Sequence, residues 1–292
     1  MIDCLEIIQS VFGSKTELAG IRPVTGGDIN AAYLLTMSDG RHAFLKVNTK
    51  ANACFFQAEL EGLQAIRDTG AIRVPQIYET GIQENSSWLL MEFMKAAPAK
   101  KDYWEQFGIR LAEMHRANPS EYTPGGRYGF SSDNYIGSGL QVNTIRTGWV
   151  DFFRECRLDV QFRRAYAYFS HSDRITMQSL LDHLDQYLAE PEYPSLLHGD
   201  LWGGNYVTGP DGYACLIDPA VYVGNAEADL AMTELFGGFA PGFYNGYREV
   251  NGILPGYSDR RDLYNLYHLL NHLNLFGESY YNAVMKIVRR FR

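Results

Sequence analysis

The sequence is poor in cysteine and has no long apolar run. Its 292 residues include four cysteines, Cys4, Cys54, Cys156 and Cys215, which are widely scattered and form no C-x-x-C pair. A metal knuckle or a redox pair is therefore not expected, and we expect four reduced thiols in a cytoplasmic protein. The N-terminus lacks a positively charged stretch followed by an apolar core, and no run approaches 18 apolar residues. We expect neither a secretory signal nor a membrane span.

Basic residues are also in the minority. Lys and Arg total 26 against 34 Asp and Glu, which gives a formal net charge of −8. This balance argues against a general nucleic-acid-binding protein, which needs a basic face for phosphate contacts. It does not exclude ATP, because a local group of cations together with Mg²⁺ can bind phosphates on an acidic protein. The hydrophobic fraction of 46% predicts a sizeable core in one large domain or two lobes.

One short segment carries the strongest chemical signal. Asp200 follows His198 and Gly199, Asn205 lies five positions later, and Asp218 follows in Leu216-Ile217-Asp218-Pro219. A phosphoryl-transfer enzyme needs one carboxylate near the proton of the attacking hydroxyl, and an amide oxygen with a second carboxylate to hold Mg²⁺ against the ATP phosphates. The spacing predicts Asp200 as the catalytic residue, with Asn205 and Asp218 as the metal ligands. The alternatives are a cap or turn role for Asp200, a turn role for Asn205, and a carboxylate at a strand end for Asp218.

The N-terminal third contains the partners that such a site requires. Lys46 lies inside an apolar strand, and Glu59 lies thirteen residues further on, in the following helix. A kinase uses such a lysine to hold the ATP phosphates and a helix glutamate to fix it. Glu61 is the competitor for Glu59. Gly26 and Gly27 join two strands ahead of Lys46, where glycines let backbone N–H groups approach phosphates. A plain hairpin is the alternative for the two glycines.

The apolar strand that ends near residue 94 is the candidate adenine site. In kinases the backbone at the crossing between lobes hydrogen-bonds the base. The expected contacts are the carbonyl of Glu92 and the amide of Met94, with Met91 behind the base. A simple buried strand fits the same residues.

Periodicity predicts a small sheet followed by a mostly helical region. The first part has helices over residues 4–13 and 51–67 and strands over 20–24, 31–36, 41–47, 74–80 and 86–94. The second part has helices over residues 102–118, 149–168, 172–188, 227–236, 242–250, 258–276 and 279–291. Ser172 is the expected N-cap of the third of these helices. A long loop is expected over 119–147, and the catalytic loop with a short hairpin over 196–218. The pattern predicts a bilobal α+β, protein-kinase-like fold, with a nucleotide-binding lobe over residues 1–94 and a catalytic and substrate-binding lobe over 95–292.

The chain resembles the fructosamine kinase family, which belongs to the aminoglycoside phosphotransferase and choline kinase-like branch of that fold. The matching segments are Leu197-His198-Gly199-Asp200-Leu201-Trp202-x-Gly204-Asn205, Ile217-Asp218-Pro219-Ala220, Glu227-x-Asp229-Leu230-Ala231-Met232, Gln141-x-Asn143, and Leu263-Tyr264-x-Leu266-Tyr267-x-Leu269-Leu270-Asn271-His272. The resemblance spans nearly the whole chain. Its most specific part is H-G-D-L-W-x-G-N, because many other small-molecule kinases keep the spacing without Leu-Trp.

The resemblance implies ATP- and Mg²⁺-dependent phosphorylation of the 3-hydroxyl of a ketosamine, a glycated amine that is free or bound to a protein. The product would break down and free the amine. It places Trp202 and His198 on the substrate side, where the Trp202 ring could form an apolar wall for the sugar or could only brace the loop. We expect a monomer, with a dimer as the alternative.

The sequence departs from the family at two positions, where Asn225 and Ala226 replace its usual residues. Any contact that those residues make is in doubt. Glu227 and Asp229 are expected to cap a helix and to pair with an Arg, rather than to act as extra catalytic acids. Two more residues, His268 and His272, are expected to be packed or substrate-facing histidines rather than metal ligands.

Two other functions remain open from the sequence. The first is a kinase of the same fold with another hydroxyl substrate, such as an aminoglycoside, choline or methylthioribose. The second is a non-catalytic nucleotide-binding module, against which intact Lys46, Asp200, Asn205 and Asp218 argue.

Overall fold

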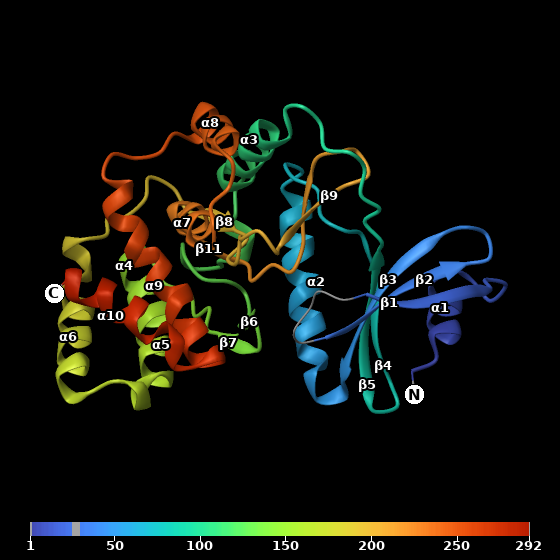
Figure 1. Ribbon diagram of the computed structural model, residues 1–292, viewed down its shortest axis with the longest axis horizontal. Coiled ribbons are helices and arrows are strands. Elements are labelled where there is room, and N and C mark those ends of the chain that lie inside the picture. The colour runs from blue at the N-terminus through green and yellow to red at the C-terminus, as the bar shows by residue number, and fades with distance from the viewer. Residues whose placement is uncertain (1, 25–29, 292) are drawn as a thin grey trace.

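The computed structural model describes residues 2–24 and 30–291, which form a small sheet-containing lobe and a larger helical lobe (Figure 1). The predicted bilobal α+β fold is confirmed. Gly26 and Gly27, which the sequence assigns to phosphate binding, lie outside the described residues.

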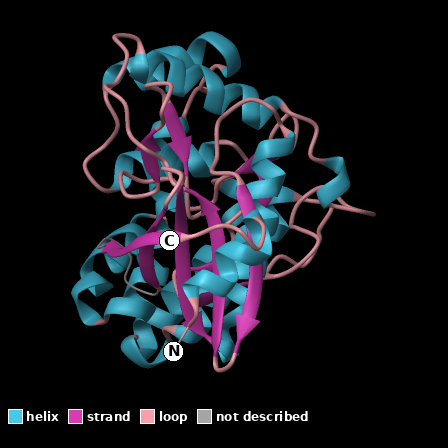
Figure 2. Cartoon of the chain, turned by 90° about the vertical axis from the view of Figure 1, so that its right-hand side faces the viewer, coloured by secondary structure: helices cyan, strands magenta, loops and turns pink. Residues whose placement is uncertain are grey.

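The small lobe is built on a five-stranded antiparallel sheet with the order β1-β2-β3-β5-β4. Its strands are β1 (Leu18–Val24), β2 (Ala31–Met37), β3 (His42–Thr49), β4 (Ile77–Gln83) and β5 (Ser86–Glu92). Figure 2 looks onto this lobe and shows the long strands side by side. The inner strand β5 is buried on both faces, since Leu90 packs with helix α1 (Cys4–Phe12) and Leu89 packs with Phe56 of helix α2. Two-sided burial explains why β5 reads as a continuous apolar run.

Helix α2 (Ala53–Asp68) lies between the sheet and the large lobe (Figure 1). Leu63 and Ile66 belong to the hydrophobic core of the large lobe. Gly62 lets the helix approach the segment after Asp218, because a Cβ there would lie 3.2 Å from Pro219 and 3.3 Å from Val221. The helix that carries Glu59 is therefore packed against both lobes.

The large lobe consists of helices around three short strand pairs. The helices are α3 (Tyr103–Arg116), α4 (Trp149–Phe152), α5 (Asp159–Arg164), α6 (His171–Asp182), α7 (Glu227–Leu235), α8 (Pro241–Asn251), α9 (Tyr257–Phe276) and α10 (Tyr281–Arg290). The pairs are β6 (Asn134–Ile136) with β7 (Gly139–Gln141), β8 (Ser195–Leu197) with β11 (Tyr222–Gly224), and β9 (Tyr206–Thr208) with β10 (Ala214–Leu216). None of the described helices has both the length and the apolar character to cross a membrane.

The structure corrects the sequence prediction at four places in the large lobe. The predicted loop over 119–147 contains the β6–β7 hairpin, and β8 and β11 were not predicted. Strands of three residues are too short to show an alternating pattern. The predicted helix over 149–168 is interrupted by a π-helical turn, Phe153–Leu158. The helix predicted from residue 172 begins at His171, because Ser170 forms a capping box with Asp173, so Ser172 is not the cap.

Candidate active site

Three charged side chains meet between the lobes. Lys46 on β3 is buried, and its Nζ lies 2.6 Å from Oε1 of Glu59 on α2. The same ammonium forms an ion pair with Oδ1 of Asp218, which enters from the large lobe. Lys46 thus pairs with one carboxylate from each lobe. Glu61 accepts a hydrogen bond from Ser132 at 2.9 Å instead, so Glu59 is the partner of Lys46.

The charges in this cluster shift one another's pKa. Burial raises the pKa of Glu59, and the neighbouring Lys46 only partly offsets this. Enclosure between the lobes also raises the pKa of Asp218, but the Lys46 ammonium outweighs it and holds that pKa below its usual value. Asp218 therefore stays ionised while its side chain remains 46% exposed.

The catalytic loop begins where β8 ends and turns sharply at Gly199. The φ angle of Gly199 is +82°, and a Cβ there would lie 2.0 Å from the carbonyl oxygen of Ala220, so only glycine fits. Asn205 donates from Nδ2 to the backbone oxygen of Asp200 at 2.8 Å and to its Oδ2 at 3.0 Å. The backbone oxygen of Asn205 accepts from the N–H of Ile217 at 3.0 Å. Asn205 therefore connects Asp200 to the strand end that presents Asp218.

Asp200 has no cationic partner among the hydrogen bonds and ion pairs of the described residues. The pKa of Asp200 is raised to about 7, mainly by burial; the hydrogen bond from Asn205 opposes the rise, and the charges of Asp218 and Asp229 add to it. A carboxyl group that titrates near neutral pH can hold or release a proton under working conditions.

Asp229, on α7, supports the loop from behind. Its carboxylate accepts from the N–H of His198 at 2.7 Å and of Gly199 at 2.9 Å, and it lies 3.1 Å from Nε2 of His115. Nδ1 of His115 lies 2.8 Å from the hydroxyl of Tyr247. Burial raises the pKa of Asp229, but the hydrogen bond and charge of His115 and those backbone donors outweigh it and leave the pKa lowered.

The sequence expectation for this helix was half right. Glu227 pairs with an arginine, Arg260, at 2.6 Å as predicted. Asp229 does not; it anchors the loop backbone instead, and sequence reasoning missed this role. The signal that could have revealed it is an Asp among apolar residues of a helix, because a buried carboxylate needs donors.

His198 differs from its predicted place against the substrate. Its side chain is 0% exposed, and Nε2 lies 3.0 Å from the backbone oxygen of Ile217. Burial also lowers its pKa. The ring therefore lies inside the loop and links it to the Asp218 segment. Its side chain has no exposed surface left for the predicted contact with a substrate.

Asp218 has a backbone conformation that is uncommon for a residue with a side chain. Its φ angle is +52°. Two residues later, the backbone N–H of Ala220 donates to the backbone oxygen of His198 at 2.8 Å. Such strain persists only where the surroundings hold it, and it is frequent at functional sites.

The β6–β7 hairpin supplies part of that support. Asn134 donates to the backbone oxygen of Val221 at 2.7 Å, and Gln141 donates to that of Ala220 at 2.9 Å. Behind them, the buried Arg157 donates to Oδ1 of Asn143 at 2.8 Å. The carboxamide groups that the sequence placed in a loop therefore fix the segment after Asp218.

The predicted adenine residues lie where β5 leaves the sheet. Met91 is buried beside Phe56, and the Glu92 carboxylate pairs with Arg73 at 2.7 Å. The side chain of Met94 is partly buried beyond the strand end. The contacts of these residues with a base remain a prediction.

Trp202 projects from the catalytic loop and is 40% exposed. Its indole lies over Gly204, where a Cβ would come within 2.4 Å of the ring. The ring meets Phe236 edge to face, with centroids 6.2 Å apart. The aromatic surface two residues from Asp200 is therefore available to a ligand.

The departures at Asn225 and Ala226 have a structural explanation at the first position. Asn225 is buried, accepts from the N–H of Glu227 at 3.0 Å and donates to the hydroxyl of Tyr264 at 3.2 Å. It serves the start of α7 rather than the open site.

The donor set suits Mg²⁺ held together with phosphates. Asn205 and Asp218 offer an amide and a carboxylate oxygen, the hard ligands that Mg²⁺ prefers, and Mg²⁺ usually keeps waters and substrate phosphates as its other ligands. Across residues 2–24 and 30–291, no three His, Cys, Asp or Glu side chains gather as a metal site of their own.

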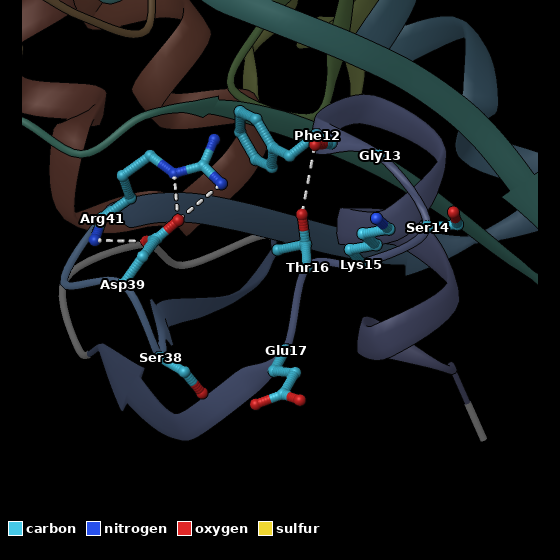
Figure 3. Close-up of a pocket in the computed structure, with 9 residues that line it drawn as sticks. All are labelled: Phe12, Gly13, Ser14, Lys15, Thr16, Glu17, Ser38, Asp39 and Arg41. Atoms are coloured by element: carbon cyan, nitrogen blue, oxygen red, sulfur yellow. Dashed lines mark hydrogen bonds and ion pairs between the residues drawn. The ribbon is translucent and has the colours of Figure 1, made fainter.

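A separate hollow of about 560 Å³ lies on the outside of the small lobe near the β2–β3 turn (Figure 3). One of the cations that line it, Arg41, pairs with Asp39 at 2.7 Å and lies over the Phe12 ring at 4.9 Å. None of the predicted site residues lines the hollow.

Comparisons with known proteins agree across the chain. The family model described as fructosamine kinase matches residues 2–292. The chain is 40% identical over 263 residues to a "Probable ketoamine kinase" of Vibrio parahaemolyticus, which covers 88% of this chain and 87% of the relative. It is 38% identical over 279 residues to a chloroplastic protein-ribulosamine 3-kinase of Oryza sativa subsp. indica, with 94% and 80% covered. A candidate fructosamine-3-kinase structure from Haemophilus somnus has a TM-score of 0.85 at 28% identity, with 98% and 95% covered.

Proposed function

Since the chain belongs to the fructosamine kinase family, we propose that the Asp200 loop and the Lys46–Glu59–Asp218 cluster form its active site. The protein is an ATP-dependent phosphotransferase that acts on a hydroxyl group of ketosamines. The roles of single residues, the 3-hydroxyl as acceptor and the use of Mg²⁺ are the proposal.

Asp200 orients the acceptor hydroxyl and takes its proton. The hydroxyl oxygen forms a bond to the γ-phosphorus, the bond to the β–γ bridging oxygen breaks, and ADP leaves with that electron pair. The proton passes to the Asp200 carboxylate, whose raised pKa of about 7 lets it hold the proton until release. Proton transfer comes late in a loose transition state, so the position of Asp200 matters more than its basicity.

Lys46 binds the ATP phosphates, and Glu59 keeps its ammonium in place. The 2.6 Å contact between them supports this assignment, because an unpaired buried lysine would be costly. Asn205 and Asp218 would hold Mg²⁺, which when bound offsets phosphate charge. At the strand end, Glu92 and Met94 present their backbone to the adenine, with Met91 behind it.

Trp202 provides the wall for the sugar. An exposed indole beside a polar loop suits the C–H face of a sugar, while Asp200 contacts the hydroxyl. Phosphorylation at the 3-position then yields a product that breaks down and frees the amine.

The observation that carries the proposal is the Asn205 bridge, which ties Asp200 to the strand end of the cation-holding Asp218. The test is a panel of ribulosamines, fructosamines and erythrulosamines with ATP and Mg²⁺, read by ADP release and by the phosphate position in NMR. We expect 3-phosphorylation of at least one of them. Turnover of none, by enzyme that binds ATP, would reject the proposal.

The same assay decides the alternative substrates. Aminoglycosides, choline and methylthioribose are included at equal concentration, and we expect their turnover to be far below that of the ketosamines.

A further inference from the structure

A second group of cations surrounds a hollow of about 480 Å³ where the end of α2, helix α3 and the β9–β10 turn come together. In Figure 1 this is the end of α2 that lies nearer to α3. Arg67 in the last turn of α2, Arg73 ahead of β4 and Arg110 on α3 line the hollow. Of the described residues, none that belongs to the proposed active site lines it. We call this feature the arginine hollow.

Two of the three arginines have no carboxylate partner among residues 2–24 and 30–291. The guanidinium of Arg110 lies over the ring of Tyr213, 4.4 Å from its centroid. Arg67 donates from Nη2 to the backbone oxygen of Pro75 at 2.6 Å. A guanidinium carries five N–H donors, so a ring face and one carbonyl leave most donors of both groups available to another acceptor.

The third arginine is paired at one nitrogen and unsatisfied at another. Nη2 of Arg73 donates to Oε1 of Glu92 at 2.7 Å. Its Nε is buried and has no hydrogen-bond partner in the described part of the chain. A buried donor without an acceptor is costly, and such a group in a native structure calls for an explanation. An acceptor from outside the chain would satisfy the Nε of Arg73.

The charges around the hollow do not cancel. Asp211, in the β9–β10 turn, lines it and accepts from a backbone N–H of its own turn at 3.2 Å. The C-terminal end of α2 adds a partial negative charge. Lys100 lies beside the same turn, because a Cβ at Gly212 would lie 3.3 Å from its Cε. With the three arginines, four cations therefore stand against two carboxylates, Asp211 and Glu92.

The donors and the excess charge together select phosphate among the oxyanions. Guanidinium groups offer paired N–H donors that match phosphate oxygens. A phosphate monoester has three strong acceptor oxygens and a charge of about −2 at neutral pH, which balances two cations. A carboxylate has two oxygens and one negative charge, so it would leave donors unused. The volume of the hollow is within the range of small-molecule sites, so there is room for an organic group beside the phosphate.

We propose that the arginine hollow binds the phosphate group of a small phosphate monoester, at a site separate from that for the ATP phosphates. This inference does not depend on the proposed function. The backbone oxygen of Arg73 accepts from the N–H of Leu216 at 2.9 Å, two residues before Asp218. A ligand on Arg73 therefore touches a residue that is hydrogen-bonded to the strand leading to Asp218.

The test observes the arginine side chains directly by NMR. ¹⁵N-labelled protein, saturated with ADP and Mg²⁺ so that the active site is filled, is titrated with glycerol 3-phosphate at constant ionic strength. The Nε–H signals are assigned from Arg73→Lys and Arg110→Lys. We expect the signals of both residues to shift to saturation, with a Kd on the order of 1 mM or below. Glycerol and succinate should give no saturating shift.

Two variants should change the affinity in opposite directions. Arg110→Gln removes a cation, so we expect the Kd for glycerol 3-phosphate to rise about tenfold, the usual size of a charge-assisted hydrogen bond. Asp211→Asn removes the facing negative charge but keeps the acceptor of the turn, so we expect the Kd to fall about threefold.

The matched control is Arg127→Gln. Like Arg110, Arg127 lies near an aromatic ring, 5.7 Å from the centroid of Tyr128, and has no carboxylate partner among the residues that the structure describes. It lies outside the arginine hollow, so we expect the Kd to stay within twofold.

Three results would overturn the inference. They are shifts that grow linearly with glycerol 3-phosphate, the same Kd in Arg110→Gln as in Arg127→Gln, or succinate binding as tight as the phosphate ester. Titration of the unaltered protein decides the first and third points even if a variant fails to fold, which its melting temperature would show. The proposed function is judged by turnover of ketosamines, so it can fail while the phosphate site stands, and the reverse.

Discussion

The front and the back of the catalytic loop hold two buried aspartates in opposite ways. Asp200, at the front, receives one side-chain amide donor, and its pKa is raised to about 7. Asp229, at the back, receives two backbone N–H donors and His115, and its pKa is lowered. The number and kind of donors account for the difference, because both carboxylates are desolvated by the surrounding protein.

The back of the loop is therefore built for stability and the front for reaction. A buried carboxylate that accepts hydrogen bonds from several donors fixes the backbone that carries those donors. A buried carboxylate with few donors lowers the stability of the fold but can accept a proton. Variants of the two residues should therefore separate turnover from stability.

The largest expected effect is the loss of turnover in Asp200→Asn. The amide cannot accept the proton of the hydroxyl, so we expect kcat to fall about 10³-fold while ATP affinity changes little. ADP release and nucleotide titration measure the two quantities. Asp211→Asn, in the exposed β9–β10 turn, is the control. Turnover near the unaltered level in Asp200→Asn would remove Asp200 from the mechanism.

The next effect is at the back of the loop. Asp229→Asn weakens three hydrogen bonds to a buried site, so we expect the free energy of unfolding to fall by about 3 kcal/mol in urea titration. We also expect kcat to fall by up to about 100-fold, because the loop shifts.

Glu227→Gln on the same helix is the matched control for that variant. It breaks the 2.6 Å pair with Arg260 but no contact with the loop, so stability falls while kcat is kept. If Glu227→Gln lowered kcat as much as Asp229→Asn, the loss would come from the helix and not from the anchor.

A smaller effect is the dependence of activity on pH. With the pKa of Asp200 near 7, protonation below that value removes the acceptor, so kcat/KM should fall by up to about tenfold for each pH unit lost. The measurement is kcat/KM from pH 5.5 to 8.5 with constant ionic strength. A flat profile across this range would show that Asp200 does not titrate there.

The smallest effect is on thermal stability, and it grows as the pH rises. The folded protein holds the Asp200 proton up to about pH 7, while the unfolded chain loses it near pH 4, so the stability from Asp200 falls as the pH rises between those values. Asparagine has no such proton to lose, so the Tm of Asp200→Asn should exceed that of unaltered protein at pH 8, and the excess should be smaller at pH 5. Scanning calorimetry measures this, and a lower Tm at both pH values would contradict it.

The sequence predicted what depends on spacing along the chain. Lys46 with Glu59, and Asp200 with Asn205, are pairs within one or two neighbouring elements, so local pattern brings them together. Long helices and strands were predicted for the same reason. Asp229 anchors a loop 30 residues away, and Asn134 contacts Val221 across 87 residues, so only the packed structure shows them. His198 was misplaced because sequence does not tell which side of a tight turn is buried.

The close packing at Gly62 has a consequence for modularity. Because α2 places Leu63 and Ile66 in the core of the large lobe and Gly62 against Pro219, the first 94 residues share part of their interior with the rest. Expressed alone, that segment would present those side chains to water. A chimaera that exchanges small lobes between relatives must therefore also carry the residues at positions 219 and 221 that match the new helix α2. Exchange of residues 1–94 alone would leave this contact mismatched.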